Sequence, residues 1–231
     1  GAAVVDADLF IIDDGAGGTN RKVTASRLKT YAGGAATIGA LTDVTMDATN
    51  FVDSILIQTN SDGSAGTTGT LSSASNNVGI GKDVFKTLTS GNENAVIGTA
   101  CGAALTSGVG NVFMGLSAGG AVTTGSYNVY IGRGAGDGHD AESDNIGIGK
   151  DGVCLPALTS GDWNVCYGSN AGESVTTGGN NVFLGGNAGN SITTGSRNIM
   201  IGYNVNASGN SGEYQIGIGD SFNLDGDNDF S

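Results

Sequence analysis

A repeat of 17 residues runs through the chain from Asn77 to Gly219. Each copy holds an Asn, two or three apolar residues and a closing Gly, as in the run Asn181-Val182-Phe183-Leu184-Gly185. The closing glycines stand 17 residues apart with a single step of 19, and they are Gly81, Gly98, Gly115, Gly132, Gly149, Gly168, Gly185, Gly202 and Gly219. A short fixed period is typical of a solenoid, in which each copy is one turn that packs only on its neighbours. The sequence therefore predicts an all-β fold, a parallel β-solenoid of 17-residue turns.

Positions within a copy are counted here from its closing glycine. Positions −3 and −1 are apolar in every copy, as in Val182 and Leu184, and their alternation places them on one face of a short strand. We expect these two columns to fill the interior of the coil. A further apolar column at position −10 predicts a second short strand in most turns, namely Leu88, Leu105, Val122, Leu158, Val175 and Ile192. Glycines at position −7 and four residues after the closing glycine would form the corners.

Position −2 lies between the two expected interior columns and should therefore point outward. It includes several large apolar residues, and a strand that is apolar on both faces is usually buried on both. We expect this column to be a subunit interface, with a second copy of the chain as the simplest partner. The interface candidates are Val96, Phe113, Tyr130, Phe183 and Met200.

Position −4 is an amide in every copy, which predicts a ladder of hydrogen bonds from turn to turn. The ladder residues are Asn77, Asn94, Asn111, Asn128, Asn145, Asn164, Asn181 and Asn198, with Gln215 last. Position −2 also shows a longer period, because Gly79, Gly147 and Gly217 recur every four turns. The extra residues of the 19-residue step surround Pro156, where we expect an outward bulge.

Other parts of the chain differ from the repeats. Residues 1–35 predict a docking module with strands at Leu9–Ile12 and Arg21–Val23 and a short helix up to Tyr31. Residues 36–76 predict a connector containing a strand at Phe51–Ile57, followed by the repeats at 77–219 and an acidic tail at 220–231.

Composition excludes several classes of partner. The chain has 22 acidic and 9 basic residues and a net charge of −13, which disfavours nucleic acids and anionic membrane surfaces. No stretch reaches the roughly 20 apolar residues of a membrane span, so we expect no membrane insertion.

Residues able to carry chemistry are few, and we expect no enzyme, no cofactor and no metal site. His139 lies in what reads as a polar corner, without a partner nucleophile. The cysteines Cys101, Cys154 and Cys166 have no metal-ligand spacing and read as buried fillers, with a redox role as the alternative. Asp225, Asp227 and Asp229 could offer oxygen ligands to calcium, although a solvated tail is the simpler interpretation.

The pattern N-x-x-[LMY]-G-x-x-A-G-x-x-x-T-T-G stands at residues 111–125, 164–178 and 181–195. It resembles the tandem repeats of bacteriophage tail-fibre proteins and, more distantly, the head repeats of trimeric autotransporter adhesins. The segments Asp8–Gly15, Thr19–Lys22 and Ser26–Tyr31 resemble a region near the start of marine phage virion fibres, and Leu41–Thr45 is also phage-like. The resemblance implies a homotrimeric virion fibre or spike on the tail, neck or capsid, assembled in the host cytoplasm. It would attach to other virion proteins through its N-terminal module and contribute to host adsorption through a surface glycan or receptor.

Two alternatives remain open from the sequence. One is a bacterial surface adhesin built on the same coil. The other is an ice- or glycan-binding solenoid, suggested by the pairs Thr123-Thr124, Thr176-Thr177 and Thr193-Thr194.

Overall fold

The computed structural model describes residues 9–12, 21–24, 44–48, 51–57, 71–149 and 154–224. Contacts divide the chain into two units, Gly1–Leu41 and Thr42–Ser231. In the first unit, β1 (Leu9–Ile12) and β2 (Arg21–Thr24) pair antiparallel, which confirms the two strands expected there. The helix expected up to Tyr31 lies outside the described residues.

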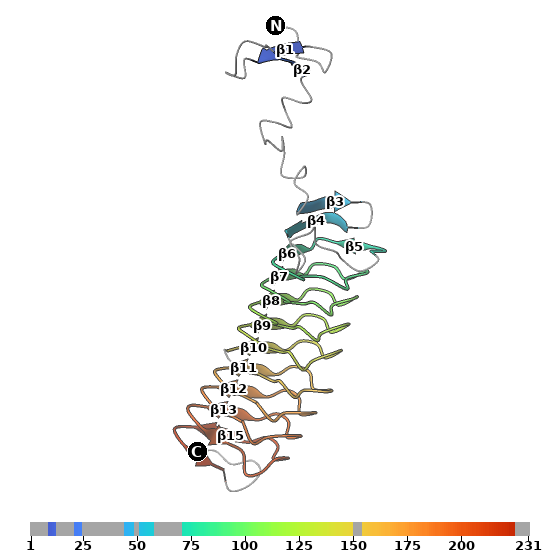
Figure 1. Ribbon diagram of the computed structural model, residues 1–231. Coiled ribbons are helices and arrows are strands. Elements are labelled where there is room, and N and C mark those ends of the chain that lie inside the picture. The colour runs from blue at the N-terminus through green and yellow to red at the C-terminus, as the bar shows by residue number, and fades with distance from the viewer. Residues whose placement is uncertain are drawn as a thin grey trace. The chain divides into compact units, whose positions relative to one another are not determined.

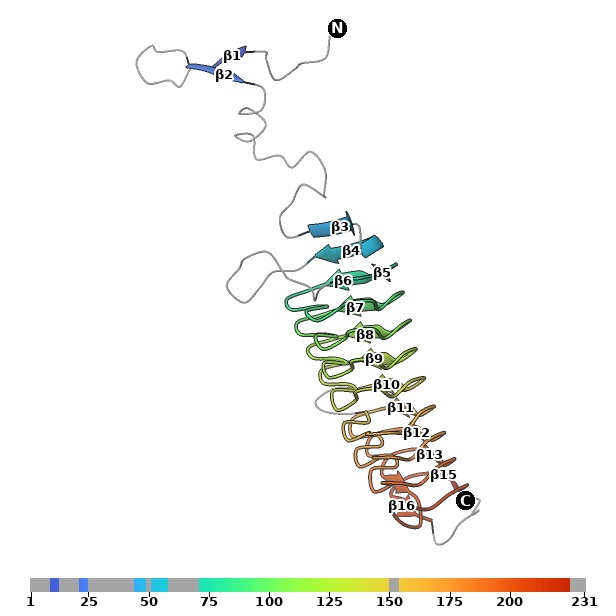
Figure 2. The ribbon, with the colours of Figure 1, turned by 90° about the vertical axis from the view of Figure 1, so that its right-hand side faces the viewer.

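The second unit is the predicted parallel β-solenoid (Figures 1 and 2). Each turn contributes one three-residue strand, and neighbouring strands pair in parallel at the same repeat position, as Val96 does with Phe113. We call each strand, with the residues that flank it, a rung. The strands in the repeat are β6 (Val78–Ile80), β7 (Ala95–Ile97), β8 (Val112–Met114), β9 (Val129–Ile131), β10 (Ile146–Ile148), β11 (Val165–Tyr167), β12 (Val182–Leu184), β13 (Ile199–Ile201) and β15 (Ile216–Ile218).

The sheet begins before the repeat does. Strand β4 (Phe51–Ile57) pairs in parallel with β6, so that Ile55 lies opposite Val78. Strand β3 (Val44–Ala48) pairs antiparallel with β4, and β5 (Ala74–Ser75) pairs in parallel with it. The segment expected to be a connector thus supplies the first rung of the sheet.

The second strand expected at position −10 is absent from the described turns. A short strand pair forms elsewhere in the last turns, three and four residues after the closing glycine, where β14 (Val205–Asn206) pairs in parallel with β16 (Phe222–Asn223). Next to position −10 two successive amides converge on one carbonyl, as Thr89 N and Ser90 N both donate to Thr106 O at 2.9 and 3.0 Å. This convergence bends the chain, whereas a parallel strand would distribute its hydrogen bonds evenly along both partners. The −10 residues are nevertheless buried, as expected.

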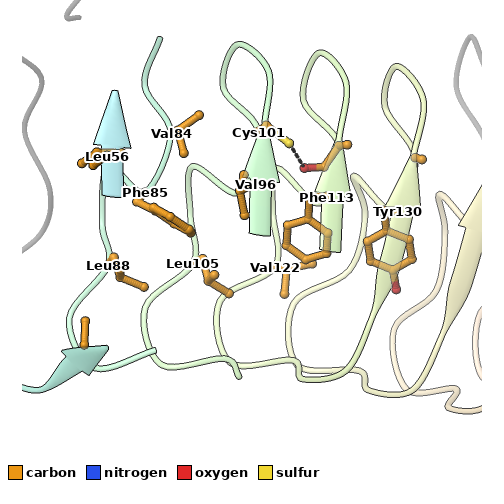
Figure 3. Close-up of a cluster of buried hydrophobic side chains, with 13 residues drawn as sticks. Leu56, Val84, Phe85, Leu88, Val96, Cys101, Leu105, Phe113, Val122 and Tyr130 are labelled. Carbon is orange, nitrogen blue, oxygen red and sulfur yellow. Dashed lines mark hydrogen bonds between the residues drawn. The ribbon is translucent and has the colours of Figure 1, made fainter. Parts of the chain in front are cut away.

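The two faces of the strands are the reverse of the prediction. Position −2 points into the coil, and the interface candidates Val96, Phe113, Tyr130, Phe183 and Met200 are all fully buried there. Figure 3 shows Val96, Phe113 and Tyr130 projecting from their strands toward Leu105 and Val122. Positions −3 and −1 point outward and stay partly exposed. The assignment of position −2 as a subunit interface is therefore wrong, because its side chains form the core of the single chain.

The four-turn period has a packing explanation. Where position −2 carries a side chain the next corner is Gly, except after Met200, and a Cβ on Gly119 would lie 2.7 Å from the ring of Phe113. Where position −2 is Gly, the corner is large, as Phe85 is after Gly79 and Leu155 is after Gly147. The corner backbone is the same in both cases, with φ of 55° at Phe85 and 57° at Gly119. One large side chain per turn fills the core, and it comes from either position.

Burial corrects the expectation of an outward bulge for two residues next to Pro156. Cys154 and Leu155 are fully buried in the second core cluster, together with Leu158 and Cys166. Residues 150–153, which belong to the same 19-residue step, lie outside the described residues.

Closing glycines are required by the stacking of the turns. Gly98 has φ of 141°, and a Cβ there would lie 2.2 Å from the carbonyl oxygen of Gly115 in the next turn. A side chain at this position would therefore force neighbouring turns apart.

Candidate interaction surface

The outward side chains of the sheet form one apolar surface, which we call the outer face. It consists of positions −3 and −1 of the ten parallel strands β4, β6 to β13 and β15. Exposed fractions reach 37% at Val112, 45% at Met114 and 60% at Tyr167. Both columns contain only Val, Ile, Ala, Leu, Met and Tyr, without a charged or amide side chain. A chain with a net charge of −13 thus keeps this face free of charge.

Two edges border the outer face. The leading edge is position −5, just before each strand, and the trailing edge is position +1, just after each closing glycine. Position −5 has a left-handed backbone throughout, with φ of 58° at Tyr127, 63° at Trp163 and 58° at Tyr214. These three aromatic side chains are half exposed or more. Bulky residues disfavour this conformation, and an exposed ring gains little core packing in return.

The amide column forms the predicted ladder, and every Asn in it is buried. Asn94 donates from its backbone N and its Nδ2 to Oδ1 of Asn77, both at 3.0 Å. Its Nδ2 also donates to the carbonyl of Gly108 in the following turn at 2.9 Å. Each amide therefore joins three successive turns, and the column is structural.

Different residues close the two ends of the ladder. At the first rung the hydroxyl of Ser54 accepts a hydrogen bond from the backbone N of Asn77 at 2.8 Å. At the last turn Gln215 folds back on Ser208, donating from Nε2 to its Oγ at 2.6 Å and accepting from its backbone N at 2.8 Å.

His139 is buried in the core, so its expected place in a polar corner is wrong. It occupies position −10, the place of Leu or Val in other turns, and it is fully buried. Its Nε2 lies 2.7 Å from Leu155 O, which can only accept, so Nε2 carries a proton. Its Nδ1 then accepts a hydrogen bond from the phenol of Tyr130, whose hydroxyl also lies 3.2 Å from Asn128 Oδ1. Sequence alignment on position −10 would have revealed this burial.

Burial governs the ionisation of this cluster. Loss of hydration lowers the pKa of His139 to about 4, and the same cause raises the pKa of Tyr130 well above its usual value. The carboxylate of Glu142, itself largely buried, opposes the shift of the histidine. The cluster is thus held neutral inside the core at physiological pH.

The three cysteines are free and buried, as expected for core fillers. Burial raises the pKa of Cys101 to about 12 and that of Cys154 to about 11, and it raises the pKa of Cys166 well above its usual value. A thiolate is the reactive form of cysteine, so these thiols are poor nucleophiles in the folded chain.

The paired threonines use part of their polar groups within the fold. The hydroxyl of Thr176 donates to Thr193 O at 3.1 Å, and that of Thr193 donates to Asn210 O at 3.2 Å. Thr123 likewise bonds Asp140 in the next turn. The first hydroxyl of each pair therefore bonds to the next turn. Few threonine hydroxyls remain to bind ice or glycans.

Within the described ranges no group of three or more His, Cys, Asp or Glu side chains is placed to hold a metal ion. The described residues also contain no helix with the length and apolarity needed to cross a membrane. Asp225, Asp227 and Asp229, the calcium candidates, lie outside them. No protein family, no curated protein and no solved structure matches this chain.

Proposed function

We propose that this chain is a non-enzymatic structural protein, the shaft of a bacteriophage virion fibre or spike. A β-solenoid is compatible with a structural role in a fibre or an adhesin. The resemblance of the repeat and of residues 8–31 to phage fibre sequences favours the virion. In this proposal the N-terminal module docks on other virion proteins, and the shaft contributes to host adsorption.

The observation that carries the proposal is the contrast between the two sides of the strands. The interior is closed by apolar packing and by an amide ladder that satisfies its own hydrogen bonds. The exterior presents one long uncharged face with exposed Ile97, Met114 and Tyr167. Such a molecule is suited to assembly with other rods, and we propose a homotrimer as the assembled form.

Imaging of the particle that carries the chain tests the proposal. Gold-labelled antibody against the purified chain is applied to virions from a lysate in which the chain is detected by mass spectrometry. We expect label on a fibre or spike of the tail, neck or capsid. Label on the surface of uninfected cells would favour the adhesin instead, and particles without label would overturn the proposal.

A further inference from the structure

The leading and trailing edges of the outer face differ in chemistry. On the trailing edge the described residues include both a cationic and an apolar set: Lys82, Thr99, Leu116, Arg133, Ser169, Gly186, Tyr203 and Asp220. On the leading edge acidic and aromatic residues alternate with small and polar ones: Asn76, Glu93, Gly110, Tyr127, Asp144, Trp163, Asn180, Arg197 and Tyr214. Within one chain the two edges lie at opposite ends of each strand.

The two edges match when they are displaced by one rung. The trailing residue of one rung then faces the leading residue of the next, which places Lys82 by Glu93 and Arg133 by Asp144. The same displacement places Leu116 by Tyr127 and Tyr203 by Tyr214, both pairs being exposed and apolar or aromatic. Without displacement, Lys82 faces Asn76 and Glu93 faces Thr99, and one pair of opposite charges remains, Asp144 with Lys150.

From this match we infer that copies of this chain associate in parallel at the same height, outer faces inward, with the trailing residue of each rung against the leading residue of the following rung in the neighbouring copy. The inference rests on the proposed fibre function. Parallel copies arranged around an axis that runs along the rods bring a trailing edge against a leading edge at every contact. The number of copies, three, is taken from the proposed function.

The strands alone do not provide the area that this occupant needs, and the edges must contribute. Ten strands about 4.8 Å apart rise roughly 45 Å, and three residues span about 10 Å, which gives roughly 450 Å² in projection. A stable interface buries about 800 Å² per partner, so the face needs both edges to reach that size. The exposed Tyr127, Trp163 and Tyr214 at left-handed positions extend it, which explains aromatic residues at sites where folding favours Gly or Asn.

Cysteine cross-linking tests the register. The variant Ser169→Cys with Asn180→Cys joins neighbouring copies if the displacement is one rung. The matched variant Gly186→Cys with Asn180→Cys joins them only if the displacement is zero. All three substituted sites lie at the edges, and the native cysteines are buried and do not compete. Full-length protein is oxidised under native conditions and analysed on a non-reducing denaturing gel.

We expect the first variant to run as a covalent trimer and the second as a monomer. Trimers from the second variant alone, or a native chain that light scattering shows to be monomeric, would overturn the inference. Neither result bears on whether virions carry the chain, so failure here is distinguishable from failure of the proposed function.

Charge exchange gives a second readout that does not depend on oxidation. Lys82→Glu and Glu93→Lys each place like charges together across every contact, and we expect the dissociation constant of the assembly to rise about tenfold or more. The double variant restores opposite charges and should recover most of the affinity. If the double variant assembles as weakly as the single variants while its circular dichroism shows the native fold, the pairing of Lys82 with Glu93 would be contradicted.

Discussion

Phe85 occupies the space that Gly79 leaves empty: a Cβ on Gly79 would lie 2.8 Å from Cδ2 of Phe85. The two residues therefore act as one packing unit, with the large side chain at the corner instead of in the strand. Gly119 and Phe113 form the reverse arrangement. Moving the large side chain from the strand to the corner within one turn tests this relationship.

The double variant Phe113→Gly with Gly119→Phe should recover much of the stability that each single change removes. Phe113→Gly leaves a cavity that costs about 3–5 kcal/mol, and Gly119→Phe overfills the same space at about 1–3 kcal/mol or more. The left-handed backbone at Gly119 matches that of Phe85, so a Phe can adopt it. Urea unfolding of the three variants measures the coupling, and additive losses would contradict it.

Asn181→Ala should lower the free energy of unfolding by about 3–5 kcal/mol, because it leaves several buried partners unsatisfied. Asn198 loses its acceptor for both its backbone N and its Nδ2, and Gly195 O loses its donor. The exposed Thr177→Ala in the same turn is the control and should change stability by less than about 0.5 kcal/mol. Thermal and urea unfolding measure both, and equal effects would argue against a ladder that stabilises the stack.

Stability should fall in acid because of His139. The pKa of His139 is lowered to about 4 in the folded chain from an ordinary 6.5, so the unfolded chain binds more protons between these values. This contribution is fully present above pH 6.5 and is lost as the pH falls toward about 4. Its size is on the order of 3 kcal/mol. Urea unfolding from pH 7.5 to pH 4 measures it.

His139→Leu is the matched variant, because Leu is the residue at position −10 in other turns such as that of Leu105. It should remove most of the change in the free energy of unfolding between pH 6.5 and 4. The part of that change that comes from carboxylates should remain. An unchanged slope would show that other groups cause the acid sensitivity.

Native thiols should resist alkylation. With the pKa of Cys101 raised to about 12 and that of Cys154 to about 11, the thiolate fraction at pH 8 is very small, and all three side chains are buried. Mass spectrometry after iodoacetamide should show no modification in native protein and three modified cysteines in guanidinium. Rapid modification of native Cys166 would contradict the packing described above.

The period of the repeat was sufficient to predict the stacked turns, but not which side of the strand is inside. Alternation separates position −2 from positions −3 and −1 without ranking them, since all three are apolar. The side chains at position −2 vary in size from Gly79 to Tyr130. Such variation fits an interior position, where a corner residue fills the space that a small side chain leaves. The outer columns are mostly β-branched, which instead fits an open sheet surface.

His139 was misplaced for a related reason. Its neighbours Asp137, Gly138 and Asp140 are exposed, so the local composition reads as a polar corner. The column to which it belongs is found by counting ten residues back from the closing glycine Gly149, where other turns have Leu or Val. The first rung at β4 was missed as part of the solenoid because Ser54 there replaces the Asn of the repeat.

The amide ladder ends differently at its last rung from the way it continues between turns. An Asn at the last rung would offer its amide to a further turn, so an open ladder is a surface on which another molecule could continue the stack. Gln215 has one more methylene than Asn and turns back to Ser208, satisfying its own amide within the last turn. The last rung in the described part of the chain thus satisfies its amide internally, which disfavours end-to-end stacking of a second molecule on this ladder.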